Sequence, residues 1–219
     1  MDIVYLGHSA FQLKGKRGTV VMDPYQDYVG FSLPSVTADI VTASHQHPDH
    51  NAISAVKSTS RREKPFTIVN PGEYEVGGIS VFGTQTYHDS VEGAERGINI
   101  IYTVLIDELK LCHLGDLGHE LTPELIEAIG EIDILLCPVG GHFTINAAQA
   151  VATINQLEPS IVIPMHFRTD QHDEKVFGDV AVLDVFLKEY GMATQPQPKL
   201  QVEKGNLPAT TELVVLSSR

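Results

Sequence analysis

The segment ADIVTASHQHPDH, residues 38–50, runs from an apolar stretch of strand length directly into a polar cluster. It contains His45, His47, Asp49 and His50. In an extended segment, residues two apart point the same way, so His45 and His47 converge on one point. Pro48 makes the chain turn, so Asp49 and His50 can aim at a second point close by. Imidazole and carboxylate groups are the ligands that zinc and similar divalent ions take, so the segment predicts a metal site at a strand end.

Polar side chains follow four other apolar segments in the same way. They are His88 and Asp89 after VFGTQTY, His113, Asp116 and His119 in LCHLGDLGH, His142 after ILLCPVGG, and His166 after IVIPM. Architectures that combine helices with parallel strands place their sites at the carboxyl ends of those strands. We therefore expect five chain segments to deliver ligands to one edge of a pair of sheets.

The apolar pattern predicts an α+β protein with two packed sheets and helices outside them. The first forty residues and the stretch 66–112 show short strand patterns. Helices are expected at 51–60 with Asn51 as cap, and at 121–132 with Thr122 as cap and Pro123 at the first helical position. Further helices are expected from 145 to a point before Pro159, and at 179–191 with Gly191 at the end.

The chain has 219 residues, with 15 Lys and Arg against 28 Asp and Glu, for a formal net charge of −13. This charge disfavours extended binding to nucleic acid and to anionic membranes. Cys112 and Cys137 lie in apolar runs, which predicts two buried, reduced thiols. The start, MDIVYLGHSAF, has no signal-peptide pattern, so we expect a cytoplasmic protein.

The ordered motifs resemble the metallo-β-lactamase superfamily, and more closely its small branch of UlaG-like and RomA-like metal-dependent hydrolases. The resemblance rests on the HxHxDH signature at 45–50, LGHSAF at 6–11, the turn Asp23–Pro24, HLGD at 113–116 and IPMH at 163–166. It implies a four-layer αββα sandwich and one domain, 1–219, with halves of roughly 1–110 and 111–219.

The same resemblance implies two divalent metal ions, with zinc as the first expectation and manganese or iron as alternatives. It assigns His45, His47 and His88 to one ion, Asp49, His50 and His166 to the other, and Asp116 to a bridge between them. His113 lies near the GD motif and competes with His88 for the third position.

The function expected from these residues is hydrolysis of a small ester, lactone or phosphoester by a metal-bound hydroxide that Asp49 orients. His142 is the first candidate for protonating the leaving group, and His8 is the second. Arg96 and Arg168 either hold an anionic substrate group or form surface ion pairs. His119 and His172 are expected at the surface.

Two other functions stay open at this point. One is a nuclease or phosphodiesterase, which the net charge disfavours. The other is a non-catalytic metal-binding module that keeps the fold. The expected partner is a small-molecule substrate, with no nucleic acid and no membrane, and a homo-oligomer is left open.

Overall fold

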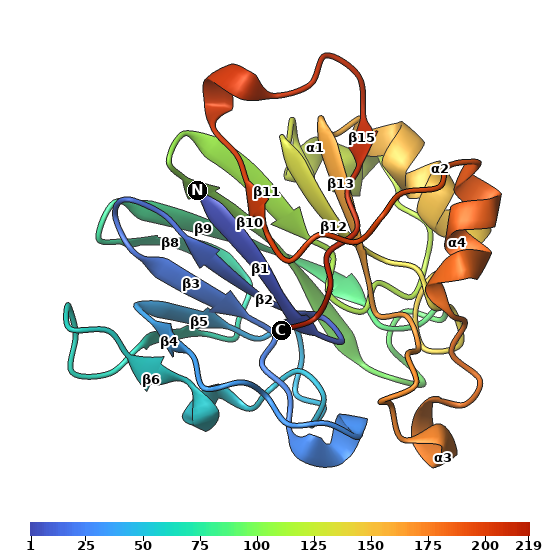
Figure 1. Ribbon diagram of the computed structural model, residues 1–219, viewed down its shortest axis with the longest axis horizontal. Coiled ribbons are helices and arrows are strands. Elements are labelled where there is room, and N and C mark those ends of the chain that lie inside the picture. The colour runs from blue at the N-terminus through green and yellow to red at the C-terminus, as the bar shows by residue number, and fades with distance from the viewer.

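Two β-sheets pack face to face in the computed structural model, which describes residues 1–219 (Figure 1). The first sheet has the strand order β14 (Leu200–Gln201), β1 (Asp2–Gly7), β2 (Ala10–Lys14), β3 (Thr19–Met22), β5 (Ile40–Thr42) and β7 (Phe66–Ile68). The second has the order β15 (Glu212–Leu213), β13 (Ile161–Met165), β12 (Ile134–Pro138), β11 (Leu109–His113), β10 (Ile98–Ile106), β9 (Ile79–Tyr87) and β8 (Gly72–Val76). The two-sheet prediction is confirmed.

Strands β1, β3 and β5 of the first sheet are apolar on both faces because both faces are covered. In β1, Ile3 and Tyr5 belong to the large core between the sheets, whereas Val4 and Leu6 belong to a smaller core on the outer face. This alternation follows from the two-residue repeat of a strand. It explains why the sequence shows continuous apolar runs instead of an apolar–polar alternation.

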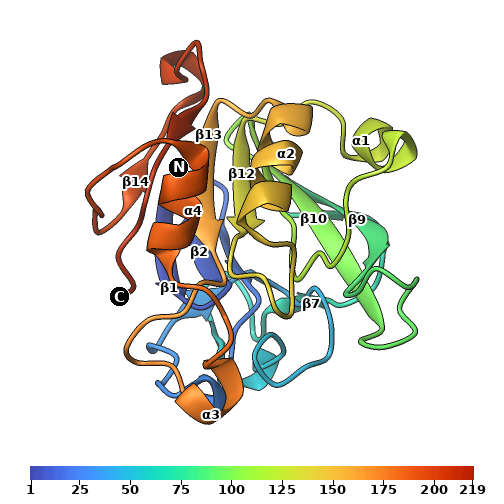
Figure 2. The same cartoon turned by 90° about the vertical axis from the view of Figure 1, so that its right-hand side faces the viewer.

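Helices cover the outer face of the second sheet, where α2 and α4 lie over β12 and β13 (Figure 2). The helices are α1 (Pro123–Ile129), α2 (Ala147–Leu157), α3 (Glu174–Phe177) and α4 (Leu183–Tyr190). The hydroxyl of Thr122 accepts the Leu125 N–H at 3.3 Å, and Gly191 ends α4 in the left-handed conformation. The helix starts and stops predicted at these two residues are confirmed.

The helix expected at 51–60 is wrong. The segment forms a single 3-10 turn, Ile53–Ala55, followed by β6 (Lys57–Ser58), which pairs with β4 (Thr37–Ala38). The side chain of Asn51, expected to cap a helix, instead donates to the carbonyl of Gln46 at 2.8 Å. β-Branched residues in the segment also favour extended backbone. The outer layer on the first sheet is therefore made of loops, of the 3-10 turns at Asp27–Val29 and Ile53–Ala55, of this short strand pair, and of α3, whose Phe177 packs into the smaller core.

The carboxyl ends of the parallel strands meet at one edge of the sandwich. β3, β5 and β7 are parallel in the first sheet, and β11, β12 and β13 are parallel in the second. The division of the chain near residue 110 stays a prediction. The second sheet already takes β8, β9 and β10 from the first half, and β14 returns to the first sheet from the second half.

Candidate metal centre

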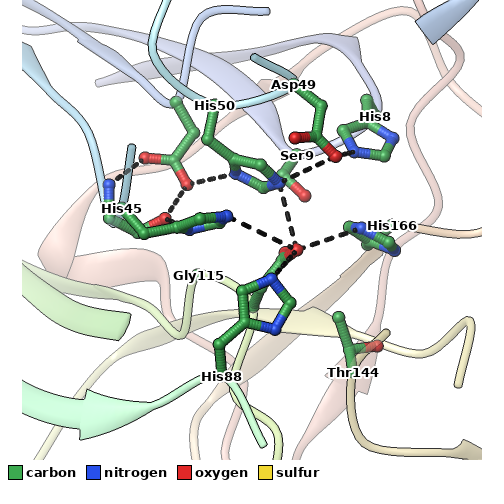
Figure 3. Close-up of polar contacts among 12 residues, drawn as sticks. His8, Ser9, His45, Asp49, His50, His88, Gly115, Thr144 and His166 are labelled. Atoms are coloured by element: carbon green, nitrogen blue, oxygen red, sulfur yellow. Dashed lines mark hydrogen bonds and ion pairs between the residues drawn. The ribbon is translucent and has the colours of Figure 1, made fainter. Parts of the chain in front are cut away.

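Strand ends from both sheets deliver imidazole and carboxylate groups to this edge (Figure 3). Three overlapping groups have ligand atoms within 4.8 Å of one another: His8, Asp49, His50 and His166; His45, His47 and His88; and His45, His50 and Asp116. All seven residues that the sequence suggested as metal ligands therefore lie together. His47 is the exposed member of the cluster.

Asp116 lies at the centre of the cluster. Its Oδ2 atom is 3.2 Å from Nε2 of His50, 3.2 Å from Nε2 of His88 and 3.3 Å from Nε2 of His166. Nε2 of His45 is 3.9 Å away. One carboxylate thus faces imidazoles from three different loops, as a bridging ligand would.

Gly115 makes this placement of Asp116 possible. Its φ is +58°, and a side chain there would run into Asn99 Oδ1 and would approach the Ser44 Cβ to 2.6 Å. The Asn99 side chain in turn accepts the backbone N–H of Asp116 at 2.9 Å. The GD pair of the sequence is therefore a fixed turn in which glycine is required.

Asp23 orients two of the imidazoles, a role that was not predicted beyond the turn it shares with Pro24. Its fully buried carboxylate accepts Nδ1–H of His50 at 2.8 Å, the Ser44 backbone N–H at 2.8 Å and the Ser44 hydroxyl at 2.5 Å. The Ser44 oxygen lies 3.0 Å from Nδ1 of His45 and accepts its proton. Both rings therefore carry their proton on Nδ1 and turn the lone pair of Nε2 toward Asp116. The signal in the sequence was the position of Asp23, which directly follows a buried strand.

The buried polar atoms of this cluster fit a cation. His45 Nε2, His50 Nε2, His88 Nδ1, both ring nitrogens of His166 and Asp116 Oδ1 have no hydrogen-bond partner. A lone pair on His50 Nε2 that faces a carboxylate oxygen at 3.2 Å is repulsive unless a proton or a metal ion lies between them. A divalent ion removes that conflict, so the donor set fits metal binding.

The electrostatics of the cluster also favour a bound cation. Burial alone would lower the pKa of His50, but the carboxylates of Asp116 and Asp49 outweigh it and raise that pKa well above its ordinary value. Burial would raise the pKa of Asp116, but His166 and His50 hold it well below the ordinary value. The pocket therefore attracts positive charge, as a metal site must.

His8 and His172 form a directed chain to Asp49. The backbone N–H of Thr169 donates to His172 Nδ1 at 3.0 Å, which leaves the proton of His172 on Nε2. That nitrogen lies 3.3 Å from His8 Nδ1, and His8 Nε2 lies 3.3 Å from Asp49 Oδ2. The expectation of a surface position for His172 is wrong, because its ring packs against His8, Phe31 and Phe177.

The other histidines of the sequence analysis lie outside the cluster. Both ring nitrogens of His113 are engaged, with the Ser9 carbonyl at 2.8 Å and the Gly115 N–H at 2.9 Å, so its ring is turned away from the ligands. His119 is half-buried and accepts the Tyr87 N–H at 3.3 Å. His142 is exposed, and its ring stands 4.3 Å from the ring of Phe143.

A small cavity of about 250 Å³ opens on the cluster. It is lined by Tyr28, His47, Pro48, Asp49, His88, Arg96, Asp116, Phe143, Val176 and Phe177. Arg96, one of the two arginines suggested by the sequence, thus lies at the site. Arg168 does not line the cavity and donates instead to the Val180 carbonyl at 3.1 Å.

The sandwich and the cluster at its edge define the class of metallo-β-lactamase-fold proteins, and comparisons with known proteins place the chain within it. The family model described as "Beta-lactamase superfamily domain" matches residues 2–166, and the chain belongs to that family. A UPF0173 metal-dependent hydrolase of Thermoplasma volcanium is 32% identical over 193 residues, which cover 77% of this chain and 84% of the relative. The prediction of a metal-dependent hydrolase of this superfamily is confirmed at this level.

Solved structures agree with this assignment. A protein of Thermotoga maritima, assigned to the zinc-dependent hydrolases of the metallo-β-lactamase superfamily, is 35% identical with a TM-score of 0.81, covering 100% of this chain and 99% of its own. The short form of human tRNase Z is 13% identical with a TM-score of 0.55, covering 78% of this chain and 95% of its own, and shares the fold alone. No helix in the structure combines the length and apolar character that crossing a membrane requires.

Proposed function

We propose that this protein binds two divalent metal ions, zinc first among them, and hydrolyses a small ester, lactone or phosphoester. The observation that carries the proposal is the arrangement around Asp116. Its carboxylate faces Nε2 atoms of three buried histidines within 3.3 Å, and these histidines have ring nitrogens without hydrogen-bond partners. His45, His47 and His88 would hold one ion, Asp49, His50 and His166 the other, and Asp116 would bridge them. When bound, such ions make water acidic and stabilise the negative charge that develops during hydrolysis.

The side chains of this protein then have separate tasks. Asp49 lines the cavity, so its carboxylate can orient a water molecule there. We infer that His8 acts through Asp49 as a positioning residue, since its Nε2 lies 3.3 Å from the Asp49 carboxylate and His172 fixes its other nitrogen. Asp23 holds His50 and, through Ser44, His45 in the tautomer that ligation needs.

The leaving group needs a proton donor near the cavity. His142 is our candidate because its ring packs on Phe143, which forms one wall of the cavity. Its exposed position means that the ring would have to turn toward the bound substrate. Replacement of His142 by Gln should therefore slow substrates with poor leaving groups more than substrates with good ones.

Elemental analysis combined with turnover tests the proposal. The purified protein should contain two divalent ions per chain and hydrolyse at least one member of a panel of esters, lactones and phosphodiesters. His45→Ala and Asp116→Ala should each lose metal and activity together, because each leaves an incomplete set of ligands. His119→Ala removes a histidine outside the cluster and serves as the matched control.

Three results separate the candidate functions. Unchanged metal content in both ligand variants would refute the site. Two bound ions without turnover on any substrate would favour the non-catalytic module. Cleavage of RNA with strong dependence on salt would favour the nuclease.

A further inference from the structure

We propose that Arg96 forms an anion-binding subsite beside the metal centre, so that the substrate is a small molecule with a carboxylate or phosphate group next to its scissile bond. This inference rests on the proposed function, because it assigns a substrate class to the same site. Arg96 has a defined position at the cavity and few partners there.

The Arg96 guanidinium packs over the ring of Phe143 at 5.7 Å from the ring centre, and both residues line the cavity. Stacking on an aromatic ring holds the planar group and leaves its N–H edge free to meet an acceptor. The Arg96 side chain is 34% exposed, so the group is open to a ligand but not loose in solvent.

The backbone beneath Arg96 is fixed by the residue next to a proposed metal ligand. The carboxylate of Asp89 accepts four backbone N–H groups, those of Val91, Gly93, Glu95 and Arg96, at 2.7–3.0 Å. Asp89 directly follows His88, so one short segment sets both a ligand and the loop that carries Arg96. This is the kind of support that a binding group needs in order to be held ready before the substrate arrives.

No group of the protein satisfies the Arg96 guanidinium. The nearest carboxylate oxygen, on Glu95, is 4.0 Å away on a side chain that is 68% exposed, which makes a weak surface pair. Arg168 offers the contrast, because its Nε donates to the Val180 carbonyl and it does not line the cavity. Arg96 is therefore free to bind a ligand, whereas Arg168 supports the chain.

Charge at the site favours an anion despite the net charge of −13. The proposed ligand set contributes two carboxylates, Asp49 and Asp116, and two divalent ions more than neutralise them. Arg96 adds one further positive charge at the same cavity. The volume of about 250 Å³ suits a small molecule. A compact anionic ester, lactone or phosphoester fits both constraints.

Substrate pairs that differ by one charge test this inference. They are methyl succinate and methyl succinamate, a butyrolactone carboxylate and its carboxamide, and methyl glycolate carrying an anionic monomethyl phosphate on its hydroxyl and the same ester carrying a neutral dimethyl phosphate. The first two pairs probe a carboxylate next to the scissile ester, and the third probes a phosphate there. Arg96→Gln should raise KM for the anionic member of the accepted pair by roughly 10- to 100-fold, the usual effect of losing a hydrogen bond between charged groups. KM for the neutral member should stay within about twofold.

Two further variants make the result specific. Arg96→Lys keeps the charge but not the planar group, so it should fall between wild type and Arg96→Gln. Arg17→Gln removes the same charge from an exposed residue in the β2–β3 turn, at the opposite end of the sheet, and should behave as wild type. Equal effects of Arg96→Gln and Arg17→Gln, or equal effects on both members of a pair, would overturn the inference and leave the proposed function intact.

If the protein hydrolyses no member of these pairs, a binding measurement tests the Arg96 subsite. Calorimetric titration of the protein as purified should show succinate binding more tightly than succinamate, and Arg96→Gln should abolish that preference. This outcome would uphold the subsite even where the hydrolase proposal fails. The same succinate affinity in wild type and Arg96→Gln would refute it.

Discussion

Replacement of Asp23 by Asn should weaken metal binding without removing any proposed ligand. The substitution keeps the shape of the side chain but replaces one acceptor oxygen with an N–H donor. Asp23 Oδ2 now accepts the His50 Nδ1–H at 2.8 Å and the Ser44 hydroxyl, so a donor at that position would face two donors. The relief is a change of tautomer that places the His50 proton on Nε2, the atom that would bind the metal.

Two magnitudes follow from these contacts. Loss of an outer partner of a ligating histidine typically costs 10- to 100-fold in metal affinity. Loss of a buried hydrogen bond to a carboxylate costs about 1.5–3 kcal/mol of folding free energy. We therefore expect a zinc affinity reduced by roughly 10- to 100-fold, together with a loss of about 3 kcal/mol in the free energy of unfolding of the metal-free protein.

Asp39 provides the matched control. It is also buried and also accepts a backbone N–H, from Thr19 at 2.8 Å, and the hydroxyl of Thr59. It precedes β5, at the end of the strand opposite to the metal cluster. Asp39→Asn should lower stability by a similar amount and leave zinc affinity unchanged. Competition against a chromophoric chelator measures the affinity, and urea unfolding measures the stability. Wild-type zinc affinity in Asp23→Asn would refute the tautomer argument.

Three other perturbations have defined outcomes. Gly115→Ala should lower the free energy of unfolding by about 2–4 kcal/mol in urea titrations, because φ is +58° and the new Cβ would approach the Ser44 Cβ to 2.6 Å; a loss below about 1 kcal/mol would contradict the close packing. Burial raises the pKa of Cys112 to about 12 and that of Cys137 further, so neither thiol should react with a disulfide reagent at mildly alkaline pH until urea unfolds the chain; rapid labelling of the native protein would contradict this. Removal of metal by a chelator should lower Tm by several degrees, because buried carboxylates lose their counter-charge, and added zinc should restore it; an unchanged Tm would count against a bound cation.

The sequence could predict the His/Asp cluster because its proposed ligands lie within three residues after an apolar strand or in the dense motif 45–50. Strand patterns locate the strand ends, and imidazole and carboxylate groups at those ends indicate a metal site. The two cysteines were predictable for a similar reason, since an apolar run without a second nearby ligand indicates a buried thiol. The structure shows both as free and buried.

The hydrogen bonds that orient the proposed ligands could not be predicted in the same way. Asp23 and His172 act through partners that are distant in the chain: His50 is 27 residues from Asp23, and His8 is 164 residues from His172. Single-sequence patterns do not encode such pairings. The helix prediction for 51–60 was wrong for another reason. The weak helix preference of this segment was overridden by the pairing of β6 with β4.

The strand ends of the site carry backbone strain, and the strain belongs to the function. His8, Asp23 and His166 each follow a strand without an intervening residue, and their φ angles are +55°, +46° and +52°. A non-glycine residue in this region costs about 1–3 kcal/mol, which is large beside a total stability of about 5–15 kcal/mol. Glycine would remove that cost, but it would also remove the side chain.

Contacts between the sheets offset this cost. The backbone N–H of His166 donates to the His8 carbonyl at 2.8 Å, so the strained ends of β13 and β1 are bonded directly to each other across the two sheets. The Tyr5 hydroxyl donates to the same carbonyl at 2.8 Å from within the core. The packing of the two sheets thereby fixes the strained backbone. The side chains that this backbone carries at the edge are held in place as a result. A metal centre assembled from scattered loops needs this rigidity, because each imidazole must already point inward before an ion binds.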